Sequence, residues 1–165
     1  MAKLRKITPC LWYDDQAEAA ASFYVGIFPH SKITAISHYG EAGSEIHGRK
    51  AGSVLTVNFE LDEQPFTALN GGPIFRLNEA VSFQVFCETQ QELDRFWDKL
   101  SAGGDPAAQQ CGWLKDKFGL SWQIVPTIME EVLAGGVTEK SQRAFAAMME
   151  MKKLDIAALK KAYDG

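Results

Sequence analysis

The sequence contains few cysteines, and they lie far apart. Cys10, Cys87 and Cys111 are the only three, and no two of them form a Cys-x-x-Cys pair. An odd, scattered set in a chain without an export signal is typical of reduced thiols rather than of a disulfide framework. We therefore expect a reduced, cytoplasmic protein.

Long apolar runs and clusters of one charge are also missing. The charged segment 1–6 lacks the apolar core of a signal peptide, and no later run is long enough to span a bilayer. The net charge is −4, and the basic residues form no cluster. These absences disfavour a membrane or a nucleic acid as a partner.

Phosphate-binding loops are absent as well. The run Gly71-Gly72-Pro73 follows a predicted strand but opens no predicted helix, so it matches neither the Walker pattern nor the dinucleotide pattern. No strand-to-helix glycine motif suited to S-adenosylmethionine occurs either. The sequence therefore offers no loop for a nucleotide-derived cofactor.

The elements that are present follow one another twice in a similar order. With 165 residues, 46% of them hydrophobic and 23% charged, the chain is typical of a single globular domain. Periodicity predicts a first unit, 5–73, with a strand at 7–13, a helix at 16–27 and strands at 31–39, 53–61 and 64–70. The second unit, 80–126, has a strand at 81–88, a helix at 90–100, a weak strand or loop at 105–110 and a hairpin at 112–126. Helices are predicted at 127–134, 138–151 and 154–163 in a tail, 127–165.

An internal repeat supports this division. Asp15-x-x-Glu18 and Thr89-x-x-Glu92 both resemble capping boxes ahead of a helix. Superimposing these boxes also places Phe86 on Trp12 and Ser82 on Thr8. The two units are therefore expected to share one strand–helix–strands pattern.

Alternation along the strands divides their side chains between two faces. In the second unit Phe83, Val85 and Cys87 point to one side, so Ser82, Gln84 and Phe86 point to the other. In the last strand Gln123 lies between Trp122 and Ile124 and points away from both. Amides within strands need partners, and a ligand, a water molecule or a neighbouring amide would each serve.

These stretches resemble a known group of proteins. The residues that carry the resemblance include Pro9-Cys10-Leu11-Trp12-Tyr13-Asp14 and Gly112-Trp113-Leu114-Lys115-Asp116-Lys117-Phe118-Gly119. They are similar to the PhnB-like group of the vicinal oxygen chelate, or glyoxalase/bleomycin-resistance, superfamily, and the tail also looks like that group. Its members often carry the name 3-demethylubiquinone-9 3-methyltransferase, a function for which the chain has no cofactor loop.

The resemblance implies an α+β fold. Two βαβββ units would form a curled mixed sheet with helices on its convex side, followed by a C-terminal helical extension. Such proteins usually pair as homodimers, and the Met-rich cluster Phe145, Met148, Met149 and Met151 would then either contact a partner chain or pack on the parent domain.

The resemblance also implies positions for a divalent metal. In metal-bearing relatives the ligands are His, Gln or Glu from the first and last strands of each unit, and the matching positions here are Thr8, Asn70, Ser82 and Gln123. All four are neutral, and neutral hydroxyls and amides are weak ligands without an anionic partner. We therefore expect no metal and no other cofactor.

The same strand faces give a predicted ligand pocket. Besides the four matching positions, it includes Cys10, Trp12, Asn58, Gln84, Phe86 and Trp113. Core packing would explain the aromatic residues equally well, and Cys10 is better explained as a small buried thiol than as a nucleophile. No catalytic residue can be named. Lys115, His38 and His47 are the available candidates for a base.

Two functions remain open at this point. The first is a metal-free small-molecule binding or resistance-type protein whose ligand is unknown. The second is an enzyme, such as an isomerase, lyase or methyltransferase, that acts on a small metabolite in the same cup. A titratable group inside the cup with its pKa moved toward neutrality would favour the enzyme.

Overall fold

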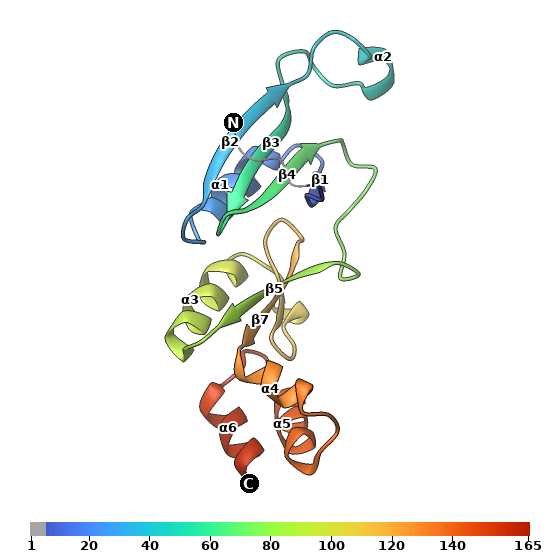
Figure 1. Ribbon diagram of the computed structural model, residues 1–165. Helices are drawn as coiled ribbons and strands as arrows, with labels where there is room; N and C mark the ends of the chain where they lie inside the picture. The colour runs from blue at the N-terminus through green and yellow to red at the C-terminus, as the bar shows by residue number, and fades with distance from the viewer. Residues whose placement is uncertain (1–5) are drawn as a thin grey trace. The chain divides into compact units, whose positions relative to one another are not determined.

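A computed structural model describes residues 6–165, and the chain forms two units, the first ending at Leu77 and the second spanning Asn78–Gly165 (Figure 1). The elements of the first unit are β1 (Cys10–Tyr13), α1 (Ala17–Val25), β2 (Lys32–His38), α2 (Ser44–His47), β3 (Val54–Leu61) and β4 (Gln64–Asn70). Its four strands pair in the order β1-β4-β3-β2. β1 runs parallel to β4, and the other two pairings are antiparallel.

One face of this sheet is covered by α1. Val57 and Phe59 of β3 pair with Ala68 and Phe66 of β4, and all four side chains are buried. Small alanines let α1 approach closely, and its Tyr24 stacks on Phe59 with ring centroids 6.3 Å apart. Burying these side chains supplies about 1.5–3 kcal/mol for each large one. Within residues 6–77, no helix covers the opposite face of the sheet, and we call it the first open face.

The start of α1 differs from the predicted capping box. The N-cap residue is Gln16, and no side-chain cap from α1's own flank is formed. The Asn70 Oδ1 instead accepts a hydrogen bond of 2.8 Å from the Ala17 backbone N–H. A tertiary contact therefore satisfies one N–H of the first helical turn, where the sequence predicts a local cap from Asp15 and Glu18.

The second unit repeats this plan with one strand fewer. It contains β5 (Ser82–Cys87), α3 (Gln90–Ser101), the short 3₁₀ turn η1 (Pro106–Ala108), β6 (Trp113–Lys115) and β7 (Ser121–Pro126). The strands pair in the order β5-β7-β6, with β5 parallel to β7. The predicted cap of α3 is confirmed, because the Thr89 side chain accepts from the Glu92 N–H. Where the first unit has β2, the second has η1 and its flanking loop.

The helix α3 covers one face of the second sheet. Leu93 and Leu100 of α3 are buried, as are Leu114, Trp122 and Ile124 of the two hairpin strands. Because side chains alternate along a strand, Gln84, Phe86, Trp113 and Gln123 lie on the other face. We call that face the second open face.

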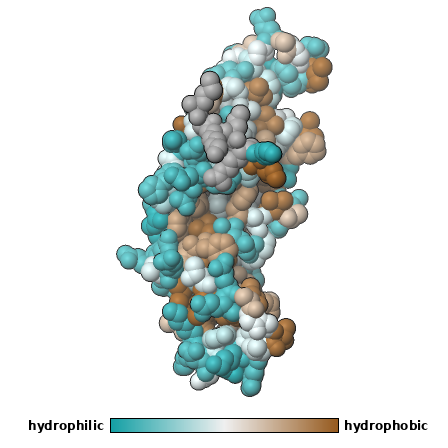
Figure 2. All heavy atoms as spheres, in the orientation of Figure 1, coloured by the Kyte–Doolittle hydropathy of each residue, from teal (hydrophilic) through white to brown (hydrophobic). Residues whose placement is uncertain are grey.

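Three helices follow β7, namely α4 (Ile128–Ala134), α5 (Glu139–Met149) and α6 (Ile156–Asp164) (Figure 1). Thr138 and Ser141 form a capping box at the start of α5. Arg143 ties α5 to the end of α6, since it donates to the Ala162 and Tyr163 carbonyl oxygens at 2.9 Å each. Figure 2 shows hydrophilic residues over much of this helical part on the face in view, with apolar residues toward one edge.

The α+β class predicted from the sequence is thus confirmed, with mixed sheets, one helix on each sheet and C-terminal helices. Among the helices of residues 6–165, none has the length and apolar character needed to cross a membrane.

Candidate functional site

A row of three side chains crosses the second open face. The register pairs Gln84 with Gln123 on parallel strands and Gln123 with Trp113 on the antiparallel hairpin. Gln123 Nε2 donates to the Ser82 hydroxyl at 2.8 Å, and Gln84 Nε2 lies 3.5 Å from Gln123 Oε1. Ser82, Gln84 and Gln123, predicted separately, therefore form one hydrogen-bonded amide cluster.

The amide cluster retains unused bonding capacity. An amide offers two donors and one acceptor oxygen, and the two glutamines make only the contacts just described among residues 6–165. The Gln84 carbonyl oxygen and one N–H of each glutamine remain free within that part of the chain. Together they present an acceptor and two donors on the same open face.

A cavity of about 510 Å³ lies over this row. The sheet contributes four of its lining residues, Gln84, Trp113, Gln123 and Val125. The helical tail contributes five more, Met129, Leu133, Met148, Met149 and Leu154. Its size is in the range of small-molecule pockets, and its lining combines a largely apolar wall with a few polar groups.

Backbone contacts fix the tail beside the hairpin. The N–H groups of Cys111 and Gly112 donate to the Met151 and Lys152 carbonyl oxygens at 2.8 Å each. Cys111 adopts a φ of 51° and Gly112 one of 83°. A Cβ on Gly112 would lie 3.0 Å from a methyl carbon of Leu154, so the close approach of the tail favours glycine here.

Side chains add to this attachment. Gln90 at the start of α3 donates to the Leu154 carbonyl at 3.1 Å and accepts from the Ile156 N–H at 2.9 Å. Gln110 Nε2 donates to the Met149 carbonyl at 2.9 Å. The tail wall of the cavity is therefore bonded to both the helix and the hairpin of its own unit.

The charged groups at the cavity are paired with each other. Glu79 lines the cavity, and its carboxylate forms an ion pair with the Lys115 ammonium. The hydrogen bond from Lys115 is the main reason why the pKa of Glu79 lies below its usual range. The pKa of Glu79 therefore moves away from neutrality rather than toward it.

The other candidate bases and thiols lie elsewhere. His38 ends β2, and His47 lies in α2, so both belong to the first unit. Cys87 faces α3, and burial raises the pKa of its thiol to about 12, which keeps it protonated. Cys111 does line the cavity, where its Sγ lies 3.7 Å from Met149 Sδ.

Three of the predicted residues lie on the first open face. Cys10 and Trp12 of β1 share this face with Asn58 of β3, whose Oδ1 accepts from the Thr67 hydroxyl at 3.0 Å. Cys10 is exposed, so the expectation of a buried thiol is wrong, although partial desolvation by its neighbours raises the pKa of the thiol. Thr8 lies just before β1 and is half-buried.

Trp12 is held by its own unit. Its indole N–H donates to the Gly72 carbonyl at 2.8 Å, and its ring meets Phe75 edge-on with centroids 5.0 Å apart. A Cβ on Gly71 would lie 2.2 Å from the Trp12 ring, so the glycine makes room for the indole. The Gly71-Gly72 pair therefore serves as a platform for Trp12 and opens no helix.

Asn70 is placed differently from the sequence expectation. It shares strand parity with Phe66 and Ala68, and its buried side chain lies on the face that α1 covers. Its Nδ2 donates to the Val54 carbonyl at 3.1 Å, in addition to the contact that its Oδ1 makes with α1. The register makes Thr67, which pairs with Cys10, the counterpart of Gln123, which pairs with Gln84.

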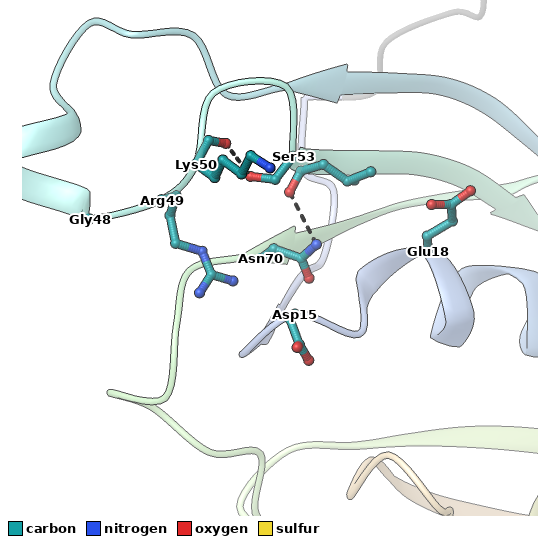
Figure 3. A pocket seen from close by; sticks show the side chains of 8 residues that line it. Asp15, Glu18, Gly48, Arg49, Lys50, Ser53 and Asn70 are labelled. Carbon is teal, nitrogen blue, oxygen red and sulfur yellow. Dashed lines mark hydrogen bonds between the residues drawn. The ribbon is translucent and has the colours of Figure 1, made fainter.

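A second pocket, of about 350 Å³, lies in the first unit near Asn70 (Figure 3). Asp15 and Glu18 from the start of α1, and Arg49 from the loop after α2, line it. Arg49 donates to the Asp14 carbonyl and lies 3.6 Å from the Asp14 carboxylate. The Arg49 guanidinium at this pocket is therefore already paired with the neighbouring Asp14.

Asp116 is a buried residue whose role the sequence did not reveal. Only 3% of Asp116 is exposed, so its carboxylate lies inside the turn rather than in solvent. Its Oδ1 accepts from the Phe118 and Leu120 N–H groups, and its Oδ2 accepts from the Trp122 indole at 2.8 Å. An Asp two residues ahead of a turn amide is a known turn signal, and it could have indicated this cap.

Comparison with known proteins identifies the family. The family model described as 3-demethylubiquinone-9 3-methyltransferase matches residues 5–125. The chain belongs to this family. A search of curated proteins gave no match.

Solved structures of relatives agree with this family. The putative 3-demethylubiquinone-9 3-methyltransferase, PhnB protein, from Bacillus cereus is 34% identical, with a TM-score of 0.63 over 74% of this chain and 100% of its own. Protein PA1353 from Pseudomonas aeruginosa is 16% identical, with a TM-score of 0.56 over 74% of this chain and 98% of its own. Fosfomycin resistance protein FosX from Mesorhizobium loti is 13% identical, with a TM-score of 0.53 over 78% of this chain and 95% of its own. The family has the fold of the vicinal oxygen chelate superfamily, and the match ends before the helical tail.

The metal that the superfamily implies does not fit the residues of this family member. Asn70 faces α1 with both ends of its amide bonded, while Ser82 and Gln123 bond each other. None of the matching positions supplies an anionic ligand. Throughout residues 6–165, no three His, Cys, Asp or Glu side chains come together in a way that could hold a metal ion.

Proposed function

We propose that the protein binds a small molecule, without a metal ion, in the cavity of the second unit, as a sequestering or resistance-type member of its family. The observation that carries this proposal is the amide cluster. Gln84 and Gln123 offer a free acceptor and a free donor on the floor of a largely apolar cavity. Such a lining orients a ligand and holds it by burial of apolar surface.

The charges of the cavity support binding over acid–base catalysis. A general base works best with a pKa near the operating pH. Lys115 and Glu79 neutralise each other, and the pKa of Glu79 is held low by that contact. The alternative function, an isomerase, lyase or methyltransferase, would need a group that this pair does not supply.

A thermal-shift screen tests the proposal. A broad metabolite library is added to the intact protein, and we expect aromatic or amphipathic compounds to raise its melting temperature. A ligand at 100 times its Kd stabilises by about 2.7 kcal/mol, which raises the melting temperature by several degrees. S-adenosylmethionine is included and is expected to give no shift.

Two variants locate the binding site. Gln123→Ala removes the centre of the amide cluster and should abolish most of the ligand-induced shift. Gln91→Ala is the matched control, because Gln91 lies exposed on α3 of the same unit. The proposal fails if no compound shifts the melting temperature, or if the shifts survive Gln123→Ala unchanged.

A further inference from the structure

The tail supplies a wall of the cavity that the family match does not include. The match ends at residue 125, and the five tail residues of the lining begin at Met129. The Bacillus cereus structure, although covered completely, accounts for 74% of this chain. The part of the cavity that the tail forms therefore lies outside the matched residues 5–125.

This wall is rich in sulfur. Met129, Met148 and Met149 line the cavity together with Cys111, and the Cys111 Sγ lies 3.7 Å from Met149 Sδ. Trp113 lies on the sheet side of the same cavity. Thioethers are polarisable and make favourable contacts with aromatic rings, and their unbranched chains adapt to a ring's shape.

The floor and the charges restrict the ligand further. Gln84 and Gln123 leave the Gln84 carbonyl oxygen and one N–H of each amide free within the described residues, which suits a hydroxyl or carbonyl group on the ligand edge. The charge of Glu79 is compensated by Lys115. An ionic ligand would lose its hydration without gaining an uncompensated counter-charge.

We propose that the tail is the ligand-selecting wall of this cavity, and that its ligand is a neutral, flat aromatic molecule with a hydroxyl or carbonyl on one edge. This proposal rests on the proposed function, since it names the class of ligand for the same site. Met129, Met148 and Met149, which we call the methionine wall, pack against the aromatic ring. The amide cluster forms hydrogen bonds with the hydroxyl or carbonyl on its edge.

Three matched probes test the ligand class. These are 2-naphthol, naphthalene, which lacks the polar edge, and decahydro-2-naphthol, which keeps the hydroxyl but is not aromatic. Binding to the intact protein is measured by calorimetric titration. We expect 2-naphthol to bind at least about tenfold more tightly than decahydro-2-naphthol. Gln123→Ala should weaken the binding of 2-naphthol and leave that of naphthalene unchanged.

Methionine variants test the wall. Met148→Leu and Met149→Leu preserve side-chain volume and remove the thioether. Each should reduce the preference for 2-naphthol over decahydro-2-naphthol by about threefold. Met151→Leu is the control, because Met151 lies in the same segment but outside the lining of the cavity.

The outcomes separate this proposal from the proposed function. Equal affinity for the aromatic and saturated alcohols, or an unchanged preference in both methionine variants, overturns the selecting wall. The proposed function would still stand if a ligand from the library depended on Gln123. If 2-naphthol binds without any dependence on Gln123, the assignment of the polar edge is overturned. If none of the three probes binds, the ligand class is overturned.

Discussion

The Asp116 carboxylate holds the turn between β6 and β7 together. It accepts hydrogen bonds from two backbone N–H groups of the turn and from the Trp122 indole, and almost none of it is exposed to solvent. Hydrogen bonds to a charged acceptor contribute more than neutral ones, and a buried donor left without a partner is costly. The hairpin that carries Trp113 and Gln123 therefore depends on one side chain.

We predict that Asp116→Ala lowers the free energy of unfolding by about 3 kcal/mol, because it leaves three donors without their acceptor. Asp116→Asn keeps one acceptor oxygen and should lose less. Chemical denaturation followed by fluorescence measures both. Asp98→Ala, an exposed position on α3, is the control and should change little. Equal stability of Asp116→Ala and the wild type would contradict the assigned role.

Strand alternation made some residues of the site predictable and left others hidden. Gln123 lies between Trp122 and Ile124, so its outward direction followed from the sequence, and the structure agrees. Asn70 shares parity with the apolar Phe66 and Ala68, and this alternation indicates the helix-covered face. The match to a ligand position of metal-bearing relatives had suggested the open face instead. Hydrogen bonds across the sheet, such as Gln123 to Ser82, depend on register and could not be derived locally.

At the scale of elements, the helices of the tail were predictable from the sequence, but their packing against the hairpin was not. Its three helices follow from their periodicity, within a few residues at each end, and the Thr138 cap of α5 is formed, whereas Thr127 makes no side-chain cap at α4. The contacts that set them beside the hairpin come from backbone groups at Cys111 and Gly112 and from the Gln90 side chain. Backbone donors carry no sequence signature. From the sequence, the tail methionines could therefore either contact a partner chain or pack on the parent domain.

One contact of the tail depends on pH. Lys153 Nζ lies 2.9 Å from the Asp94 carboxylate. The pKa of Asp94 is lowered, first by a hydrogen bond from Gln90 and then by the contact with Lys153. A carboxyl whose pKa is lowered by folding stabilises the folded state above its unfolded pKa of about 3.8, and this stabilisation is lost as the pH falls through the lower folded value.

We therefore predict that Asp94→Asn is less stable than the wild type at pH 6, and that the difference disappears as the pH falls below about 3.8. The pair is well exposed, so the difference at pH 6 should be on the order of a few tenths of a kcal/mol. Denaturation curves recorded from pH 6 to acid measure it. A difference that grows in acid would refute the assignment.

At the scale of the whole molecule, we predict a homodimer. The resemblance implies pairing, and within the described residues Ile36 on the edge strand β2 and Phe86 on the second open face remain 40% and 45% exposed. A symmetric pairing would bury such side chains on both chains. Light scattering at micromolar protein should give twice the mass of one chain, and a monomer mass would count against the prediction.

We also predict that the purified protein carries no tightly bound divalent metal. A cation that enters a site built from neutral amides and hydroxyls loses its hydration without gaining negative charge. Elemental analysis after dialysis should show well under one equivalent of Zn, Ni, Mn, Fe or Co, and a chelator should leave the melting temperature unchanged. A stoichiometric metal that Gln123→Ala removes would instead favour a metal-dependent enzyme.

The parallel pairing of the first and last strands of each unit has a consequence for the order in which a nascent chain can fold. Cys10 can pair with Thr67 only after Thr67 has left the ribosome, and Gln84 can pair with Gln123 only after Gln123 has been synthesised. Contacts between residues so distant in sequence form slowly, because a long loop must close first. The methionines of the wall emerge after both sheets are complete. The cavity can therefore be completed only after the strands of both sheets have been synthesised.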